Sequence, residues 1–394
     1  MLNEKIFSKI TTPAYVYHEK ILRKNLDILK NTISPYAGLF YSMKANPQKY
    51  ICHMMNKSGL GIEVASGGEL RLALEAGVNP NDIIFTSPGK TEKELEYAIE
   101  KKIKYINIDS YEEAEIINRI GINNNQVIKL IVRVNPAVSF SHAKIKMSGV
   151  PSQFGIEEEQ LGFFLKKIKK LNNIQIVGFH IYMGTQMLLA EDIEKNTDYA
   201  LNLFLDIAKK YNLSVEMFDV GGGFGVQYFE NEKELDLVDL KNRLHNVFEK
   251  YAIELKGIRI MFESGRFLTA QAGEFIAKVL YVKYSKGIKY VICDGGSNFH
   301  SSAAFLGRYV RGNFPITTYP IGDETEVTTI TGPLCTPLDV IGQKVEINSA
   351  ICPGQYVIIE NSGAYGLTYS PLHFLSHDMP MEYMDIDGDV IELR

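Results

Sequence analysis

The chain has 394 residues, of which 45% are hydrophobic and 11% aromatic, so it can bury a large core as two domains or one enlarged barrel. The net charge of −5, without a basic tract, argues against nucleic acid as the main partner, and no apolar run is long enough to span a bilayer. The N-terminus lacks the apolar core of a signal peptide, so we expect a soluble, cytoplasmic protein.

The cysteines are widely spread and form no Cys-x-x-Cys pair. This spacing predicts neither a disulfide framework nor a zinc site, so we expect a reduced compartment and no bound metal. The four residues are Cys52, Cys293, Cys335 and Cys352.

Before residue 265, short apolar runs rich in β-branched residues alternate with longer amphipathic stretches. Eight such strand–helix units in succession predict an α/β fold of the (β/α)₈ barrel type. The expected strands are residues 38–43, 61–65, 82–86, 105–109, 129–134, 174–182, 215–220 and 258–263.

After Glu263 the pattern changes to strands and loops with few helices, which predicts a β-rich second domain. The opening stretch TTPAYVYH also alternates like a strand and precedes the first barrel unit, so it is a candidate to join that domain. We therefore expect a barrel over residues 36–265 and a β-rich domain formed by residues 1–35 and 266–394.

Polar side chains stand at the ends of most of the predicted barrel strands. Because active sites of such barrels lie at the C-terminal ends of the strands, these side chains are candidate site residues. They are Lys44, Glu63, Ser66, Arg133, His180, Tyr182, Asp219, Glu263 and Arg266.

Glycines follow the last two barrel strands, as Gly221-Gly222-Gly223 and as Gly265. Glycines let backbone N–H groups approach a phosphate closely, and barrels often bind phosphate at this position. The spacing does not match G-x-G-x-x-G, so a dinucleotide site is disfavoured. A lysine opposite a phosphate site predicts pyridoxal 5′-phosphate, with Lys44 forming the Schiff base and Glu263 beside the pyridine nitrogen.

From TPAYVY near residue 12 to GAYG at residue 363, the chain resembles the fold-type III pyridoxal-phosphate decarboxylases. This family includes diaminopimelate, ornithine and arginine decarboxylases, and alanine racemase is a more distant relative. The motifs that carry the resemblance are YSMKANP, GIEVASGGEL, DVGGGFG, FESGRF, GPLCTPLD and NSGAYG.

The resemblance implies an obligate homodimer in which the partner subunit supplies Cys335 as the proton donor to Cα. It also implies that Asp339 holds the cysteine loop or the substrate, and that Arg133 and Thr336 contact the substrate. The implied cofactor-binding residues are Lys44, His180, Tyr182, Gly222, Gly223, Glu263, Gly265, Arg266 and Tyr365.

Three departures from the family pattern bear on the substrate. Tyr182 replaces a histidine that stacks on the cofactor ring, Thr336-Pro337 replaces Glu-Ser, and FHSSAAFLGRY replaces an arginine-proline segment. The last two changes remove groups that bind the distal end of diaminopimelate, so that substrate is disfavoured.

The segments KIKMSGVPSQFGI and GFGVQYFENEKELD resemble the secondary-metabolism branch, which includes the butirosin-pathway decarboxylase of carrier-protein-bound glutamate and siderophore-pathway decarboxylases. This resemblance implies decarboxylation of an L-amino acid, free or tethered to an acyl-carrier protein, in antibiotic or siderophore synthesis. A basic rim for an acidic carrier would come from Lys144 and Lys146, or from Arg308 and Arg311.

Three other functions remain open. They are diaminopimelate decarboxylation in lysine biosynthesis, racemisation, and noncatalytic binding of the cofactor. The cysteine loop argues against racemisation, which needs a second base opposite the lysine, and the β-rich domain argues against a simple cofactor-binding barrel.

Overall fold

The computed structural model describes residues 4–138, 145–146, 151–304 and 312–393. The chain divides into a barrel unit, Asp27–Gly225 with Glu234–Gly265, and a β-rich unit, Met1–Leu26, Val226–Lys233 and Arg266–Arg394. These units differ from the expected ranges in two segments. Residues 27–35 lie with the barrel, since the boundary between the units falls within helix α2 (Glu19–Ile33), after Leu26. Residues 226–233 lie with the β-rich unit, where Tyr228 packs on Phe314 with ring centroids 4.8 Å apart.

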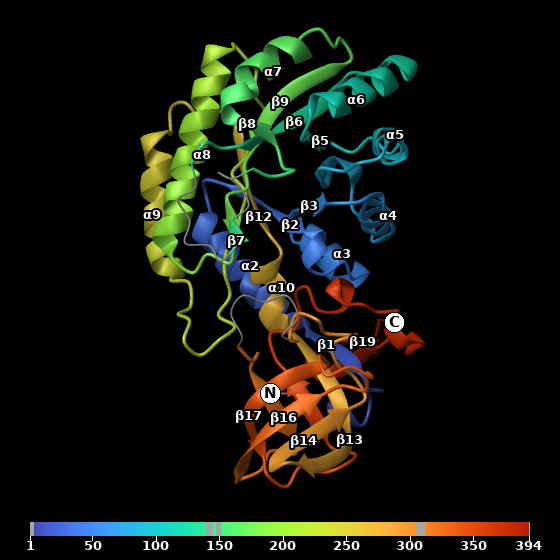
Figure 1. Ribbon diagram of the computed structural model, residues 1–394. Coiled ribbons are helices and arrows are strands. Elements are labelled where there is room, and N and C mark those ends of the chain that lie inside the picture. The colour runs from blue at the N-terminus through green and yellow to red at the C-terminus, as the bar shows by residue number, and fades with distance from the viewer. Residues whose placement is uncertain (1–3, 139–144, 147–150, 305–311, 394) are drawn as a thin grey trace. The chain divides into compact units, whose positions relative to one another are not determined.

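The barrel unit is a closed ring of eight parallel strands, in which β2 pairs with the last strand, β12 (Figure 1). All eight predicted strands are confirmed, with ends that differ from the expected ones by at most two residues. In barrel order the strands are β2 (Gly38–Ser42), β3 (Gly61–Val64), β4 (Ile83–Thr86), β5 (Tyr105–Ile108), β6 (Ile128–Asn135), β9 (Ile174–His180), β11 (Met217–Asp219) and β12 (Arg259–Ser264).

Amphipathic helices cover the outside of this ring, as Figure 1 shows. Several begin at a side-chain cap just beyond a strand; Ser66 accepts a hydrogen bond from the Glu69 N–H, and Thr91 forms a capping box with Glu94. These two caps fix the loops that follow β3 and β4. The helices are α3 (Lys49–Lys57), α4 (Gly67–Glu75), α5 (Glu92–Glu100), α6 (Tyr111–Asn123), α7 (Leu161–Ile168), α8 (Ala190–Lys210) and α9 (Leu237–Lys250).

Side chains inside the barrel form layers, each drawn from alternate strands. An apolar layer comes from the first, third, fifth and seventh strands, as Phe40, Ile84, Ile131 and Met217. A polar layer comes from the second, fourth, sixth and eighth strands, as Glu63, Asn107, His180 and Glu263, all at most 2% exposed. The barrel therefore places four residues that are distant in sequence in one buried polar layer.

Three short strands accompany the ring. In the part of the chain that the structure describes, β8 (Ile156–Glu157) pairs with β6, and β7 (Ile145–Lys146) pairs with β10 (Gly184–Thr185). The predicted rim residues Lys144, Arg308 and Arg311 lie outside the described residues, as does the side chain of Lys146.

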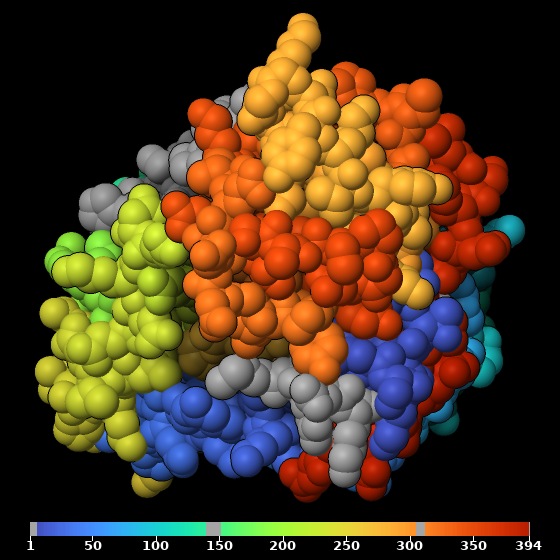
Figure 2. All heavy atoms as spheres, turned by 90° about the horizontal axis from the view of Figure 1, so that it is seen from below, coloured from blue at the N-terminus to red at the C-terminus, as the bar shows by residue number. Residues whose placement is uncertain are grey.

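The β-rich unit is a nine-stranded sheet whose main path runs β17-β16-β14-β13-β1-β19-β20, while β18 pairs with β13 and β15. The expectation that TTPAYVYH joins this unit is confirmed, because β1 pairs with both β13 and β19. Figure 2 shows the surface of these strands, from which the light-orange β13–β14 hairpin projects. The bounds are β1 (Ala14–His18), β13 (Gly273–Ser285), β14 (Ile288–Cys293), β15 (Ile316–Tyr319), β16 (Thr325–Thr331), β17 (Val340–Asn348), β18 (Tyr356–Ile359), β19 (Met381–Ile386) and β20 (Asp389–Glu392).

Helices are few in this unit. Helix α1 (Glu4–Phe7) packs on the sheet through Phe7, whose ring stacks on Tyr319 and Tyr356 at centroid distances of 4.1 and 4.8 Å. The four-residue helix α10 (Arg266–Thr269) begins the segment that leads into β13. Among the described residues, no helix has the length and apolar character needed to cross a membrane.

A histidine held between two carboxylates links three strands of the β-rich sheet. His18 Nδ1 lies 2.9 Å from Asp385 Oδ2, and its Nε2 lies 3.2 Å from Glu274 Oε2. Burial by itself lowers the pKa of His18, but the hydrogen bonds and charges of Glu274 and Asp385 outweigh burial and raise this pKa. The protonated ring therefore joins β1, β13 and β19.

We expect His18→Gln to destabilise the protein by about 1.5–3 kcal/mol at pH 5.5 and by much less at pH 9. The pKa of the folded state is raised, so the contribution is complete below the unfolded pKa of about 6.5 and is lost as the pH rises through the folded pKa. Thermal unfolding at both pH values measures the difference. As a control, His53→Gln removes a ring whose Nδ1 bonds the Ala76 carbonyl instead. Equal destabilisation by His18→Gln at both pH values would contradict the prediction.

Candidate active site

Lys44 lies directly after β2, in the short 3₁₀ helix η1 (Met43–Ala45). Its Nζ donates to Glu63 Oε1 at 2.9 Å and to Oε2 at 3.3 Å, and it lies 5.8 Å from the centroid of the Tyr182 ring. The Lys44 side chain is 39% exposed, whereas that of Glu63 is 1% exposed. A buried carboxylate thus orients an amine that a ligand can still reach.

A cluster of buried acidic and imidazole groups lies at the ends of β9, β11 and β12. His180 Nε2 is 3.5 Å from Glu263 Oε1, and Asp219 Oδ1 accepts a hydrogen bond from the Gly221 N–H at 3.0 Å. One ligand atom from each of His180, Asp219 and Glu263 lies within 4.8 Å of the other two. Such a set can surround a cation, whether a metal ion or a protonated ring nitrogen; the neighbouring lysine and glycines point to an organic cofactor.

Burial shifts the proton equilibria of all three groups. It raises the pKa of Glu263 well above the ordinary value, and the carboxylates of Glu63 and Asp219 add to this effect. Burial likewise raises the pKa of Asp219 to about 7. Burial, with the positive charges of Arg133 and Lys44, lowers the pKa of His180 well below its ordinary value, so the imidazole is neutral. Shifts of this size are typical of functional sites.

The glycine triplet after β11 packs against neighbouring backbone with no room for side chains. A Cβ on Gly222 would lie 1.8 Å from the Glu263 carbonyl oxygen, and one on Gly223, where φ is +90°, would lie 2.3 Å from the Gly184 carbonyl oxygen. Only glycine fits these two positions. The glycines therefore let this loop pack directly against the backbone of Glu263 and Gly184.

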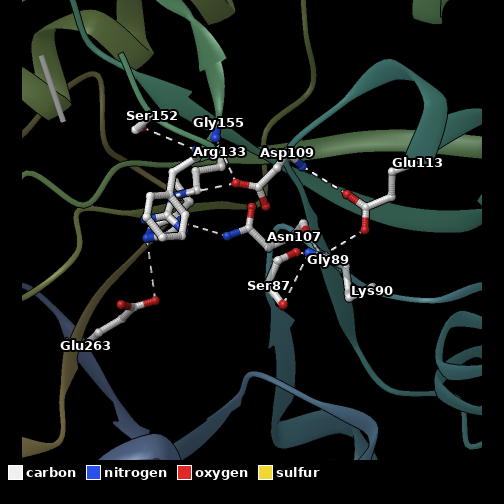
Figure 3. Close-up of polar contacts among 12 residues, drawn as sticks. Ser87, Gly89, Lys90, Asn107, Asp109, Glu113, Arg133, Ser152, Gly155 and Glu263 are labelled. Atoms are coloured by element: carbon white, nitrogen blue, oxygen red, sulfur yellow. Dashed lines mark hydrogen bonds and ion pairs between the residues drawn. The ribbon is translucent and has the colours of Figure 1, made fainter. Parts of the chain in front are cut away.

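Arg133 lies on β6, paired in register with His180. Its guanidinium lies 4.4 Å from the centroid of the Phe154 ring, and its Nε lies 3.9 Å from Asp109 Oδ1. The same Asp109 oxygen accepts a hydrogen bond from the Gly155 N–H at 2.7 Å, as Figure 3 shows. Arg133 thus brings a fixed positive charge to the site, while its predicted contact with substrate stays a prediction.

The β-rich unit assembles a separate cationic and aromatic group. Arg266 Nη1 donates to the Tyr228 hydroxyl at 3.2 Å, and its guanidinium lies 4.6 Å from the centroid of the Tyr365 ring. Tyr365 has φ of +53°, which is unusual for a bulky residue, and Ser302 Oγ donates to its carbonyl oxygen at 2.6 Å. Residues held in this conformation cluster at functional sites.

The loop after β16 presents Cys335 at the surface. Asp339 is 2% exposed and accepts hydrogen bonds from the Ser297 and Leu334 N–H groups at 2.7 and 2.8 Å. Thr336 Oγ1 accepts from the Leu338 N–H at 3.3 Å. Both side chains therefore hold the cysteine loop, which is one of the two tasks expected of Asp339. Contact of either with substrate stays a prediction.

Comparison with known proteins explains why this chain combines a lysine at a strand end, buried carboxylates and a glycine loop. Residues 19–270 match the model of the pyridoxal-dependent decarboxylase pyridoxal-binding domain, which is more than half of the chain. The chain belongs to the pyridoxal-dependent decarboxylases. Its cofactor is pyridoxal 5′-phosphate, and the predicted family, fold type and enzyme class are confirmed.

Two named relatives of this decarboxylase represent different substrates. It is 38% identical to the L-glutamyl-[BtrI acyl-carrier protein] decarboxylase of Niallia circulans, over 98% of this chain and 91% of the relative. It is 29% identical to the diaminopimelate decarboxylase of Bacteroides thetaiotaomicron, over 91% of this chain and 92% of that relative.

Solved structures of diaminopimelate decarboxylases share the fold of the decarboxylase. The Methanocaldococcus jannaschii enzyme has a TM-score of 0.90 and 26% identity, covering 99% of this chain and 91% of that chain. The Helicobacter pylori enzyme, solved with L-lysine, has a TM-score of 0.88 and 25% identity, covering 99% and 95%. The barrel and the β-rich unit are thus features of the family.

The residues present fit pyridoxal phosphate. Glu263 Oε1 is buried and makes no hydrogen bond within the described residues, so it can accept one from a protonated ring nitrogen. The amine of Lys44 and the glycine backbone suit the aldehyde and the phosphate of the same molecule. The structure also shows Asn107 in contact with His180 and Tyr228 in contact with Arg266, although the sequence did not single out either residue. Glu63 binds the Lys44 amine, and Asp219 lies beside His180 and Glu263. Asp219 had one sequence signal, its place directly before the glycine triplet.

Proposed function

We propose that this decarboxylase removes the α-carboxyl group of an L-amino acid tethered to an acyl-carrier protein. The observation that carries the proposal is the 38% identity to a decarboxylase of an acyl-carrier-bound glutamate, over 98% of the chain. Decarboxylation of a free L-amino acid is the nearest alternative. A role in antibiotic or siderophore synthesis and a location in the cytoplasm follow from the sequence as predictions.

The residues near the predicted distal end of the substrate support this choice. Ser301 Oγ donates to the Tyr369 carbonyl oxygen at 2.8 Å, and Ser302 bonds Tyr365, so both serines hold the segment that carries Tyr365. The sequence resemblance would put these neutral hydroxyl groups where the family's arginine-proline segment binds a distal carboxylate. Thr336 likewise offers no charge for a distal ammonium group.

Each site residue has a proposed task toward the cofactor. Lys44 would hold it covalently, Glu263 would accept a hydrogen bond from the protonated ring nitrogen, and Tyr182 and His180 would line the ring. Gly222, Gly223, Gly265, Arg266 and Tyr365 would bind the phosphate. When bound, pyridoxal phosphate withdraws electrons from the bonds at Cα of an attached amino acid.

Two of the chain's own groups would then move protons. Lys44 is positioned to accept and return a proton at its Nζ, because Glu63 holds this atom at the strand end. The Cys335 thiol of a second copy would donate the proton that Cα needs after carbon dioxide leaves, which is general acid catalysis.

A homodimer with shared sites agrees with the surface around Cys335. A groove of about 760 Å³ lies beside the cysteine loop, lined by Ile292, Thr331, Leu334 and Asp339 among others. Leu338, in the same loop, is 62% exposed. An exposed apolar side chain beside a groove and a thiol is suited to contact another subunit.

Free diaminopimelate is expected to be a poor substrate, with kcat/KM at least about tenfold below that for the glutamyl-carrier protein. Its distal ammonium and carboxylate groups would be left unpaired on leaving water, at a cost of roughly 1–3 kcal/mol each. Steady-state assays should compare diaminopimelate, lysine, ornithine and the glutamyl-carrier protein. Efficient turnover of diaminopimelate would instead support lysine biosynthesis, and no carbon dioxide from any substrate would favour noncatalytic cofactor binding.

Glu263→Gln is expected to bind the cofactor with reduced affinity and to lower kcat about 10²–10³-fold, because glutamine cannot carry the charge that stabilises a protonated ring nitrogen. Absorbance spectra measure cofactor retention, and single-turnover rates measure the chemical step. Glu249→Gln, on the exposed face of α9, is the matched control. An unchanged kcat in Glu263→Gln would contradict the assigned role.

A further inference from the structure

We propose that Asn107 is a positioning residue: its side-chain amide donates to His180 Nδ1 and thereby places the single ring proton of His180 on Nε2, facing Glu263. This inference rests on the proposed placement of Glu263 at the cofactor's ring nitrogen. Of the four residues in the buried polar layer, Asn107 is the one that has no task in the proposed reaction.

The contacts run across the interior of the barrel. Asn107, on β5, is labelled in Figure 3 and is fully buried. Its Nδ2 lies 2.5 Å from His180 Nδ1. On the other side of the ring, His180 Nε2 lies 3.5 Å from Glu263 Oε1. The imidazole therefore stands between an amide donor and a carboxyl group.

Burial and nearby charge keep the His180 ring neutral, and the Asn107 amide decides which ring nitrogen carries the proton. His180 is 1% exposed and faces the cations Arg133 and Lys44, which disfavour a second ring proton. A neutral imidazole has one N–H donor and one acceptor. Since the Asn107 amide donates to Nδ1, Nδ1 is the acceptor and Nε2 carries the proton.

A proton on Nε2 favours the charged form of Glu263. Burial, Glu63 and Asp219 all push Glu263 toward its protonated form, which cannot pair with a protonated ring nitrogen. Among the groups facing it, Lys44, Arg133 and the His180 N–H act in the opposite direction. Asn107 thus supports the carboxylate through His180, without touching the cofactor.

The backbone of Asn107 is held independently of its side chain. Lys90 has a fully buried side chain; its Nζ donates to the Asn107 carbonyl oxygen at 2.7 Å and forms an ion pair with Glu113 Oε1 at 2.8 Å. Figure 3 shows Lys90 between these two residues. Replacing the Asn107 side chain should therefore leave the end of β5 in place.

The first test uses the cofactor-free protein with ¹⁵N-labelled histidine. The His180 resonances, assigned with His180→Phe, are expected to show a neutral ring protonated on Nε2. A ring protonated on Nδ1, which requires the reverse amide orientation of Asn107, would overturn the proposal. This result does not depend on any substrate, so it is separate from failure of the proposed function.

The second test measures pyridoxal phosphate affinity against pH for Asn107→Leu. We expect about tenfold weaker binding near neutral pH and an upward shift of about one pH unit in the pH below which affinity is lost. The control is Thr86→Val, which removes a buried hydroxyl that makes no hydrogen bond within the described residues. If Asn107→Leu matched Thr86→Val in both quantities, the proposal would be wrong.

A double-mutant cycle separates positioning from general stability. In a His180→Phe background, Asn107→Leu is expected to cause no further shift in the pH profile, because its effect passes through the imidazole. An undiminished shift in that background would show that Asn107 acts by another route. If Asn107→Leu does not fold, Asn107→Ser takes its place in the cycle, and the NMR result on the unmodified chain still decides the tautomer.

Discussion

Lys44→Ala is expected to lower decarboxylation by at least about 10²–10⁴-fold, the range for loss of a positioned proton-transfer group, and to remove covalent attachment of the cofactor as well. The reason is the position of the Lys44 side chain, which is 39% exposed after β2 while its Nζ is held 2.9 Å from the buried Glu63. Single-turnover release of carbon dioxide measures the effect.

Borohydride reduction followed by peptide mapping provides the direct assignment. In the unmodified protein the pyridoxyl label is expected on Lys44, and in Lys44→Ala no lysine should replace it. Lys90→Met is an unsuitable control because Lys90 is buried and paired, so the exposed Lys57→Ala serves instead. A label on any other lysine of the unmodified protein would contradict the assignment.

The second large effect is expected from mixing two inactive variants. Lys44→Ala and Cys335→Ala should each lose about 10²–10⁴-fold in kcat, because each lacks a proton-transfer group. If the partner supplies Cys335, a mixed dimer carries one site with both residues and one site with neither. Random mixing makes about half of the dimers mixed, each with one of two sites intact, so about a quarter of the activity should return.

The control for this experiment is Cys352→Ala, since Cys352 is the other exposed cysteine among the described residues. It should keep full activity alone and should not alter complementation. Subunit exchange must be verified with differently tagged copies. Exchange without recovery of activity would mean that each site takes its lysine and its cysteine from the same chain.

The sequence by itself determined the strand order, the change to a β-rich unit after Glu263 and the position of Lys44. These features are local, because a strand, an amphipathic helix or a glycine turn is recorded in a few consecutive residues. The motifs around Lys44, Gly222 and Glu263 also sufficed to indicate the cofactor. For the same reason, the eight predicted strands differ from the observed ones by at most two residues at their ends.

Only the tertiary structure decided which polar side chains meet. Glu63, Asn107, His180 and Glu263 form one layer because barrel closure brings alternate strands together, and no local pattern records that closure. The protonation states of Asp219, His180 and Glu263 could not be predicted from the sequence either. Their pKa values depend on burial and neighbouring charges, which exist only in the folded chain. The assignment of residues 27–35 to the barrel unit and of residues 226–233 to the β-rich unit also depends on packing between segments far apart in the chain.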